Sequence, residues 1–169
     1  IRVIPGTALK NVQGEVIYTP PVGEEVIRTK LANLEQFIHA EDDLDPLVKM
    51  AVMHYQFEAI HPFPDGNGRT GRILNLLFLV EKQLSDIPVL FLSRYIITHR
   101  QDYYDGLRAI TEAQDWEAWV LFMLKAVEST AQQTSDLVNR ILALMDDVRD
   151  RVQREAEGIY SKDLIETIF

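Results

Sequence analysis

Residues 46–82 read PLVKMAVMHYQFEAIHPFPDGNGRTGRILNLLFLVEK and decide the fold of this chain. Apolar residues recur at helical spacing over 46–59, and the stretch 69–82 is apolar almost all round. Asp45 is suited to the N-cap of the first helix, with Pro46 in its first turn. The segment therefore predicts two helices joined by an irregular loop, with the second helix at the centre of the domain.

The flanking sequence extends the helical pattern in both directions. Further helices are predicted over residues 22–40, 99–114, 116–130 and 131–156. Residues 2–18 instead contain two β-rich runs around a centre with Asn11 and Gly14, which predicts a small hairpin. The predicted fold class is therefore all-α, a helical bundle with one small β-hairpin near the N-terminus.

The composition is that of a folded domain, with 169 residues of which 47 % are hydrophobic and 25 % charged. The 17 Lys and Arg against 26 Asp and Glu give a net charge of −9, which argues against nucleic acid as a general partner because such binders need a basic surface. No apolar run approaches the roughly 18 residues that span a bilayer. The chain has no cysteine, which excludes disulfides and thiolate zinc sites and fits a reducing cytoplasm.

Residues 61–72, HPFPDGNGRTGR, combine prolines, glycines and charges in a way found nowhere else in the chain. Gly68 leads directly into a helix, whose first amides are unpaired donors beside the positive end of the helix dipole. Glycines at 66 and 68 let an anion approach the backbone closely. Arg69 and Arg72 add two cations to the first turn, where they oppose the dipole unless an anion binds there. The pattern predicts a binding site for a polyphosphate.

Two further side chains of this loop carry chemistry. Asp65 would repel a phosphate unless a divalent cation lay between them, and Mg²⁺ is usually held by one or two carboxylates together with phosphate oxygens. His61 titrates near neutrality and suits a general base acting on a hydroxyl. The local charge agrees with an anionic ligand, because residues 61–108 carry a net +1 while the rest of the chain carries −10.

Structural roles compete with these interpretations. Taken alone, the turn at Gly66–Gly68 is an ordinary start of a helix. His39 and His99 are predicted to be structural, and His54 lies on the buried face of its helix, where a hydrogen-bonded core role is expected. A metal site built on His54 and His61 is disfavoured, since no cysteine or third histidine lies nearby. The joint occurrence of the histidine, the acid, the glycines and both arginines favours a functional loop.

The same stretch resembles the motif of the Fic family, His-x-Phe-x-Asp/Glu-Gly-Asn-Gly-Arg-x-x-Arg, at every fixed position. The matching residues are His61, Phe63, Asp65, Gly66, Asn67, Gly68, Arg69 and Arg72. Residues 2–18 also resemble the family's flap, and residues 92–97 with Tyr103 and Tyr104 resemble the border of its nucleotide pocket. The resemblance covers about residues 1–130 and implies a Fic-type helical bundle.

The resemblance implies a protein AMP-transferase, which moves AMP from ATP to a Ser, Thr or Tyr hydroxyl of a target protein and releases pyrophosphate. His61 would be the general base, and Asp65 would hold Mg²⁺ on the phosphates. The ATP-binding residues would be Gly66, Asn67 and Gly68 as the anion hole, Arg69 and Arg72 at the β- and γ-phosphates, and Tyr103 and Tyr104 beside the adenine. The target would add backbone hydrogen bonds at the flap, residues 2–18.

The chain departs from many family members in lacking the inhibitory motif Ser/Thr-x-x-x-Glu-Gly/Asn. The nearest match, at residues 153–158, has Gln153 where Ser or Thr is needed. We expect an inhibitory helix upstream of Ile1, because the chain lacks an initiating Met and closes on a helical pattern, as a catalytic-core fragment would. The predicted domains are a catalytic domain over 1–156 and the start of a C-terminal segment, similar to a winged helix, over 157–169.

Other functions stay open on the sequence. A toxin-like branch of the family transfers phosphate, but it resembles this loop with Lys in place of Gly68, so the glycine favours AMP transfer. Removal of AMP from a modified protein is a family activity that relies on the inhibitory glutamate, which this chain lacks. Transfer of another nucleotide stays open because the phosphate loop does not contact the nucleotide base. An ATP-sensing regulatory module linked to a DNA-binding domain is disfavoured by the acidic charge and the intact His61. The large apolar helices would support a homodimer.

Overall fold

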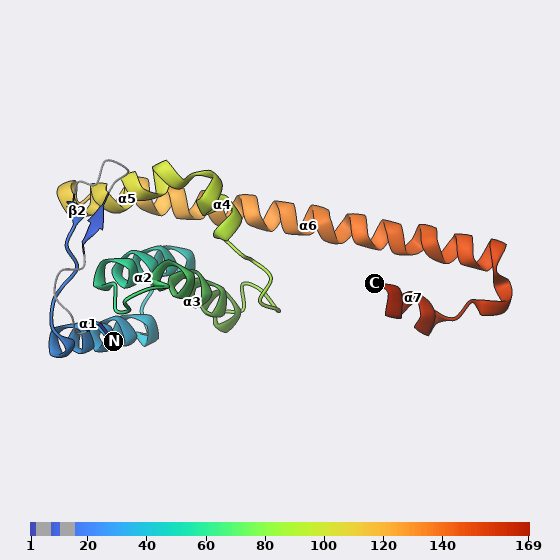
Figure 1. Cartoon of the computed structure of the whole chain (residues 1–169), viewed down its shortest axis with the longest axis horizontal. Helices are drawn as coiled ribbons and strands as arrows, with labels where there is room; N and C mark the ends of the chain where they lie inside the picture. Colours follow the sequence, from blue (N-terminus) through green and yellow to red (C-terminus); the bar gives the residue numbers. More distant parts are fainter. Residues whose placement is uncertain (3–7, 11–15) are drawn as a thin grey trace. The chain divides into compact units, whose positions relative to one another are not determined.

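Helices dominate the chain in the computed structural model, which describes residues 1–2, 8–10 and 16–169 (Figure 1). The helices are α1 (Glu24–His39), α2 (Pro46–Ile60), α3 (Asn67–Glu81), α4 (Ser93–Thr98), α5 (Arg100–Ala113), α6 (Trp116–Glu155) and α7 (Lys162–Ile168), with a 3₁₀ turn at Glu157–Ile159. The chain divides into two compact units, residues 1–130 and residues 131–169. The prediction of an all-α fold class is confirmed for the described residues.

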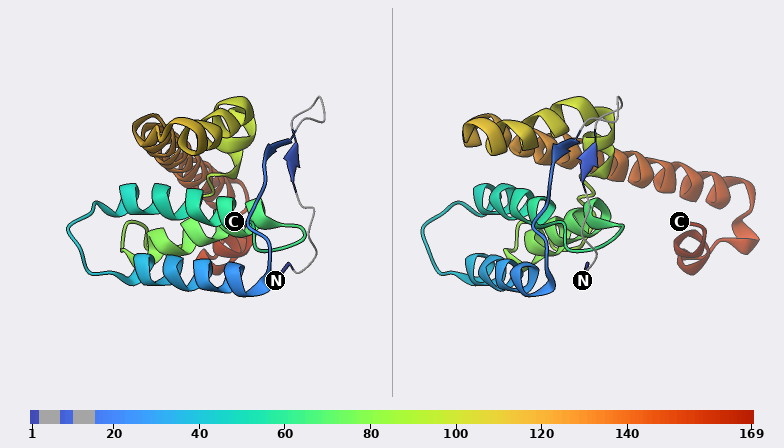
Figure 2. Two further views of the ribbon diagram at one scale, coloured as in Figure 1. Left: turned by 90° about the vertical axis from the view of Figure 1, so that its left-hand side faces the viewer. Right: turned by 60° about the vertical axis from the view of Figure 1, so that its left-hand side comes forward.

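Helix α2 packs against both α1 and α3 (Figure 2). Its start agrees with the sequence, because the Asp45 carboxylate accepts hydrogen bonds from two backbone amides of the first turn and Pro46 is the first helical residue. Helix α3 begins at Asn67 rather than at the predicted residue 69. The reason is Gly66, which precedes the helix in a left-handed conformation (φ 83°) that a residue with a side chain would adopt only with strain.

One hydrophobic core fills the first unit, and Trp119 of α6 is fully buried in it. Its indole Nε1–H donates to the carbonyl of Ala51 in α2 at 2.9 Å. A Cβ atom at Gly106 of α5 would lie only 2.9 Å from this ring, so the glycine lets the indole lie directly against α5. Other members of the core include Ile27, Met50, Met53, Phe57, Ile60, Leu79 and Met123.

A chain of polar side chains crosses this core and joins α2, α3 and α5. His54 is fully buried, with Nδ1 at 3.0 Å from Asn75 Nδ2 and Nε2 at 3.0 Å from the Tyr103 hydroxyl. Burial lowers the pKa of His54 to about 4, so its imidazole is neutral at pH 7. The core role predicted for His54 is therefore confirmed.

The N-terminal segment contains two short strands, β1 (Leu9–Lys10) and β2 (Val16–Tyr18). They pair antiparallel, with Leu9 opposite Tyr18. The hairpin flap predicted over residues 2–18 includes residues 3–7 and 11–15, which lie outside the described residues. The flap therefore stays a prediction.

The prediction of separate helices over 116–130 and 131–156 is wrong. Helix α6 runs from Trp116 to Glu155 without a break, because no glycine or proline interrupts it. In the unit formed by residues 131–169, the Ser161 hydroxyl caps α7 by accepting from a backbone amide, and Ile165 is buried.

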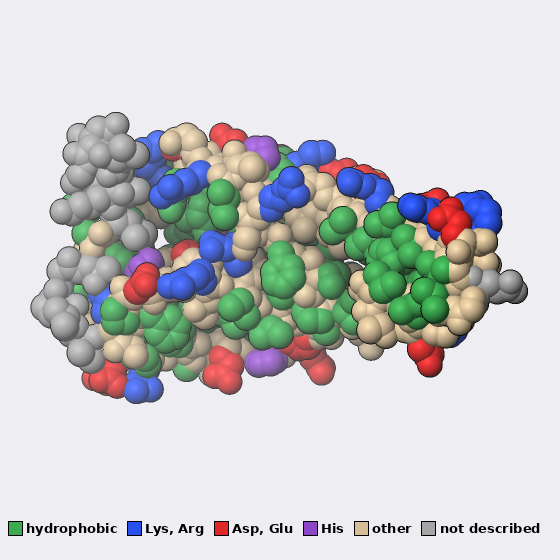
Figure 3. All heavy atoms as spheres, turned by 45° about the vertical axis from the view of Figure 1, so that its right-hand side comes forward, with side chains coloured by type: hydrophobic (Ala, Val, Ile, Leu, Met, Phe, Trp, Pro, Cys, Tyr) green, Lys and Arg blue, Asp and Glu red, His purple; other side chains and the backbone are tan. Residues whose placement is uncertain are grey.

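The face of the molecule drawn in Figure 3 carries side chains of different kinds. Charges of both signs are interspersed with apolar side chains over the face drawn in Figure 3. Among the described residues, no helix combines the length and the apolar character needed to cross a membrane.

Candidate active site

The motif loop joins α2 to α3 through two residues in the left-handed region, His61 with φ 48° and Gly66 with φ 83°. For a histidine this conformation costs about 1–2 kcal/mol, and such strain clusters at functional sites. The His61 amide closes the turn by donating to the carbonyl of Phe57 at 3.0 Å. The side chain of His61 thereby reaches the wall of a pocket beside the loop.

Asn67 holds the loop in shape with its side chain. Its Nδ2 donates to the carbonyl of Phe63 at 2.8 Å, and its Oδ1 accepts from the amide of the same residue at 2.8 Å. Asn67 is 2 % exposed, and Phe63 packs against Phe57 with ring centroids 6.3 Å apart. The Asn67 side chain is therefore fully used in stabilising the loop, which leaves only its backbone for an anion.

Arg2 ties the motif loop to the N-terminal segment, a contact that the sequence did not predict. Its backbone amide donates to the carbonyl of Pro62 at 2.7 Å, and its Nε donates to the carbonyl of His61 at 3.2 Å. A third bond runs from its Nη2 to the carbonyl of Pro21 at 2.7 Å. Arg2 is 3 % exposed, so these bonds replace water that its guanidinium has lost.

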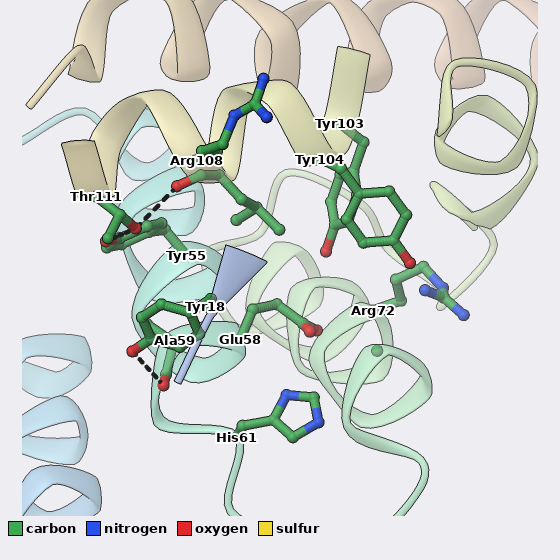
Figure 4. A pocket seen from close by; sticks show the side chains of 12 residues that line it. Tyr18, Tyr55, Glu58, Ala59, His61, Arg72, Tyr103, Tyr104, Arg108 and Thr111 are labelled. Atoms are coloured by element: carbon green, nitrogen blue, oxygen red, sulfur yellow. Dashed lines mark hydrogen bonds between the residues drawn. The ribbon is translucent and has the colours of Figure 1, made fainter. Parts of the chain in front are cut away.

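The pocket is enclosed by side chains from β2, α2, α3 and α5 (Figure 4). Its lining residues are Tyr18, Tyr55, Glu58, Ala59, His61, Gly68, Arg72, Tyr103, Tyr104, Leu107, Arg108 and Thr111. Of the site residues predicted from the sequence, the pocket brings together His61, Gly68, Arg72, Tyr103 and Tyr104. The other four lie in the loop or the first turn of α3 but do not line the pocket: Asp65, Gly66, Asn67 and Arg69.

Arg69 and Arg72 have different surroundings although they lie one turn apart. Arg69 Nη2 is 3.1 Å from Asp65 Oδ2, and these two side chains are 72 % and 92 % exposed, so the pair contributes about 0–1 kcal/mol. Arg72 Nε donates to the Ser93 hydroxyl at 3.0 Å. Its Nη1 lies 3.2 Å from the position that a Cβ atom would take at Gly68, so a side chain there would displace the guanidinium.

The imidazole of His61 is half-buried in the wall of the pocket. Burial lowers its pKa, the backbone carbonyl of Glu58 opposes this change, and the charge of Arg2 adds to it. Nδ1 is buried without a hydrogen-bond partner. The lowered pKa favours the neutral form of the ring, and Nε2 is the ring nitrogen other than the buried Nδ1.

Glu58 is a pocket residue that the sequence did not predict. It lies one turn before His61 on α2, is 8 % exposed, and its Oε1 has no hydrogen-bond partner. Burial raises its pKa to about 7, although the charge of Arg72 opposes the shift. A signal was present, since an acid at position 58 interrupts the apolar run Phe57 to Ile60, but periodicity does not reveal how deeply it is buried.

Aromatic side chains form the rest of the wall. Tyr103 is 5 % exposed and belongs mainly to the core, whereas Tyr104 is 40 % exposed and lies under the Arg100 guanidinium at 5.5 Å. Another part of the pocket wall was not predicted: it contains Tyr55, whose hydroxyl lies 3.1 Å from the Thr111 hydroxyl. Only one of the two predicted adenine-flanking tyrosines, Tyr104, thus offers a large accessible surface.

The described residues contain no cluster of three or more His, Cys, Asp or Glu side chains arranged to hold a metal ion. Asp65 is the one carboxylate between His61 and Arg72 in the sequence. A single exposed carboxylate fits Mg²⁺, which is bound largely through phosphate oxygens, better than it fits zinc or calcium.

Substitution of Glu58 with glutamine is expected to stabilise the fold at pH 8 and to have little effect near pH 4.5. The folded-state pKa of about 7 exceeds the unfolded value of 4.5, so the contribution of Glu58 is most favourable below pH 4.5 and is lost as pH rises through 7. The expected gain in unfolding free energy at pH 8 is on the order of 1–3 kcal/mol, measured by urea unfolding. Glu112→Gln, at an exposed site on α5, is the control, and an equal effect of both variants would contradict the burial of Glu58.

Gly71→Ala is expected to destabilise the fold although alanine favours helix. A Cβ atom at 71 would lie 2.6 Å from Glu58 Oε1, 3.2 Å from His54 Cε1 and 3.3 Å from Phe57 Cδ1. Such overpacking costs about 1–3 kcal/mol, more than the gain of about 1 kcal/mol in helix propensity. Adding Glu58→Ala removes the nearest atom, so a double-mutant cycle should give a coupling above about 0.5 kcal/mol, and additive effects would refute the contact.

Comparison with known proteins identifies the family of this chain. The family model described as Fic/DOC family matches residues 2–79. Protein adenylyltransferase fic-1 of Caenorhabditis elegans is 30 % identical over 115 residues, which are 67 % of this chain and 21 % of that protein. A probable protein adenylyltransferase of Aquifex aeolicus is 36 % identical over 84 residues, which are 50 % of this chain and 26 % of that protein.

Among solved structures, a Fic family protein from Desulfovibrio desulfuricans G20 matches with a TM-score of 0.63 at 30 % identity, covering 70 % of this chain and 35 % of the other. The chain thus spans between about a fifth and a third of the length of the proteins that it resembles. The family model, the relatives and the shared fold agree with the complete motif at residues 61–72, and the chain belongs to the Fic/DOC family.

Proposed function

We propose that this chain transfers AMP from ATP to a hydroxyl of a target protein. The observation that carries the proposal is the meeting of His61 and Arg72 in one pocket at the N-terminal end of α3, beside Gly68. A base, a cation and the free amides of a helix start are what attack on a phosphate requires. Relatives named protein adenylyltransferase support the same activity.

In the proposed reaction, His61 Nε2 accepts the proton of a Ser, Thr or Tyr hydroxyl. The hydroxyl oxygen forms a bond to the α-phosphorus of ATP, and the bond from that phosphorus to the bridging oxygen breaks, so pyrophosphate leaves. The backbone amides of Gly66, Asn67 and Gly68 stabilise the charge on the phosphate. Arg72 binds the terminal phosphates, and Arg69 can join it after releasing its exposed pair with Asp65.

Asp65 is the residue that would hold Mg²⁺, together with phosphate oxygens of ATP. When bound, Mg²⁺ would neutralise negative charge on the phosphates. The role of Asp65 is to orient the ion toward the loop, and its exposed side chain leaves it free to do so.

In this proposal the adenine of ATP and the target protein bind at separate places. Tyr104, with its accessible ring, would lie beside the adenine, and Tyr103 would support it from the core through the edge-on ring contact at 5.4 Å. The target segment would bind along the flap at residues 2–18 by strand addition. The catalytic domain would extend over residues 1–156, with residues 157–169 beginning another segment.

Incubation of the chain with magnesium and labelled ATP tests the proposal. Label in the α-phosphate should become covalently attached to protein, either to the chain itself or to a protein in a lysate. Label in the γ-phosphate should leave with pyrophosphate. Retention of the γ-label instead would indicate phosphate transfer, and retention of neither label would contradict AMP transfer.

Arg72→Ala is expected to weaken binding of ATP by about 1.5–3 kcal/mol, roughly 10- to 150-fold, because a charge-assisted contact to the terminal phosphates is lost. AMP should bind nearly equally to both proteins, since it lacks those phosphates. Calorimetric titration of ATP and AMP measures both affinities. Arg108→Ala is a matched control from the same pocket, and an unchanged ATP affinity in Arg72→Ala would contradict the assigned role.

A further inference from the structure

Glu58 is an acidic side chain in the wall of the nucleotide pocket, and the reaction proposed above gives it no role. The residue is 8 % exposed, and its Oε1 is buried without a hydrogen-bond partner. Figure 4 shows the carboxyl group directed into the pocket, on the side of Arg72 and Tyr103. A buried carboxyl oxygen without a partner destabilises a fold, so the presence of Glu58 Oε1 in a ligand pocket points to a role toward the ligand.

The first turn of α3 leaves room for this carboxyl group because it carries two glycines. Oε1 lies 2.6 Å from the position that a Cβ atom of Gly71 would take, and 3.9 Å from the corresponding position at Gly68. Nη1 of Arg72 lies 3.2 Å from that same position at Gly68. The Glu58 carboxyl group and the Arg72 guanidinium therefore both lie beside Gly68, at the end of α3 where the phosphates are proposed to bind.

The charge state of Glu58 depends on what occupies this helix end. Arg72 favours the ionised carboxylate while burial favours the neutral acid, and the balance leaves the pKa of Glu58 at about 7. A polyphosphate beside Arg72 would compensate the guanidinium charge and add negative charge of its own. Both changes favour the neutral acid.

We propose that Glu58 is a proton-exchanging residue of the pocket, whose carboxylate takes up one proton from solvent when the phosphates of a nucleotide bind beside Arg72. One O–H bond forms on the carboxyl group, and the proton returns to solvent when the nucleotide leaves. This role of Glu58 rests on the proposed nucleotide site. Proton uptake by Glu58 makes the nucleotide bind more tightly below pH 7 than above it. The other titratable or charged side chains that face Glu58 are Arg72 of α3, Tyr103, Tyr104 and Arg108 of α5, Tyr18 of β2, and His54, Tyr55 and His61 of its own helix and loop.

Calorimetry with the magnesium complex of α,β-methylene ATP, which cannot donate AMP, tests this role. From about pH 6.5 to about pH 8.5, the affinity of the natural chain should fall about tenfold. Titrations in two buffers of different ionisation enthalpy should report proton uptake. Glu58→Gln should bind the analogue at both pH values with the affinity that the natural chain shows at about pH 6.5, and fewer protons should be taken up on binding. Glu112→Gln, exposed on α5, should behave as the natural chain does.

The outcomes separate this role from the proposed function. If the analogue binds with the same pH dependence and proton uptake to the natural chain and to Glu58→Gln, the proton goes elsewhere and the role of Glu58 is refuted while the nucleotide site stands. If the analogue does not bind to the natural chain at either pH, the nucleotide site and the role of Glu58 both fail. Carbon-13 NMR of the Glu58 carboxyl group in the natural chain gives an answer even if the variant does not fold, because its signal must move to the protonated position when the analogue binds.

Discussion

Replacement of His61 with alanine is expected to lower the rate of AMP transfer at saturating ATP by about 10²–10⁴-fold, with little change in nucleotide affinity. The pocket contains Arg72 and the helix start for binding, so removal of the imidazole takes away the base and leaves the phosphate contacts. The measurement is the rate of incorporation of α-labelled AMP, with affinity measured separately by calorimetry.

The controls for this variant follow from the backbone. Because His61 has φ 48°, alanine also strains the turn, whereas asparagine tolerates the left-handed region, so His61→Asn removes the base and keeps the loop. His39→Ala, at a site 63 % exposed on α1, should retain full activity. Transfer by His61→Asn at the natural rate would eliminate His61 as the base.

The pH dependence of the proposed AMP transfer by the natural chain gives a further check on His61. Burial lowers its pKa below the usual 6.5, and the base must be neutral to accept a proton. The rate at saturating ATP should therefore be level at pH 7 and fall toward acid with a midpoint below 6.5.

Trp119→Ala is expected to lower the free energy of unfolding by about 3–5 kcal/mol, out of the roughly 5–15 kcal/mol typical of a domain. The indole is fully buried, stacks on His54 with centroids 6.1 Å apart, and donates to the carbonyl of Ala51. Its loss leaves a cavity beside Tyr103, whose ring centroid lies 5.6 Å away. Urea unfolding should show a lower midpoint with an unchanged slope.

Trp116→Ala is the matched control because it makes the same change on the same helix. Trp116 is 37 % exposed and meets Tyr55 edge-on at 5.1 Å. Its removal should cost about 1 kcal/mol, since one aromatic pair is lost and no closed cavity forms. Equal losses of stability in the two variants would show that Trp119 does not anchor the core.

Several features were predictable because they depend on neighbours in the sequence. Helical spacing and the Asp45–Pro46 start located α2, and the residue types from His61 to Arg72 were enough to predict a phosphate site, because they are close neighbours in the sequence. His54 was also predicted correctly, because its place on the apolar face of α2 requires burial and a hydrogen-bonded partner.

Only the tertiary structure decided which side chains share the pocket and what charge they carry. Arg69 and Arg72 lie three residues apart on one face of α3, yet Arg69 pairs with Asp65 in solvent while Arg72 lines the pocket. The sequence likewise does not distinguish Glu58 from a surface acid. The burial and pKa of Glu58 are set by side chains and backbone of other helices, α3 with Gly71 and Arg72 and α5 with Tyr103, and that packing is absent from the pattern of any single helix.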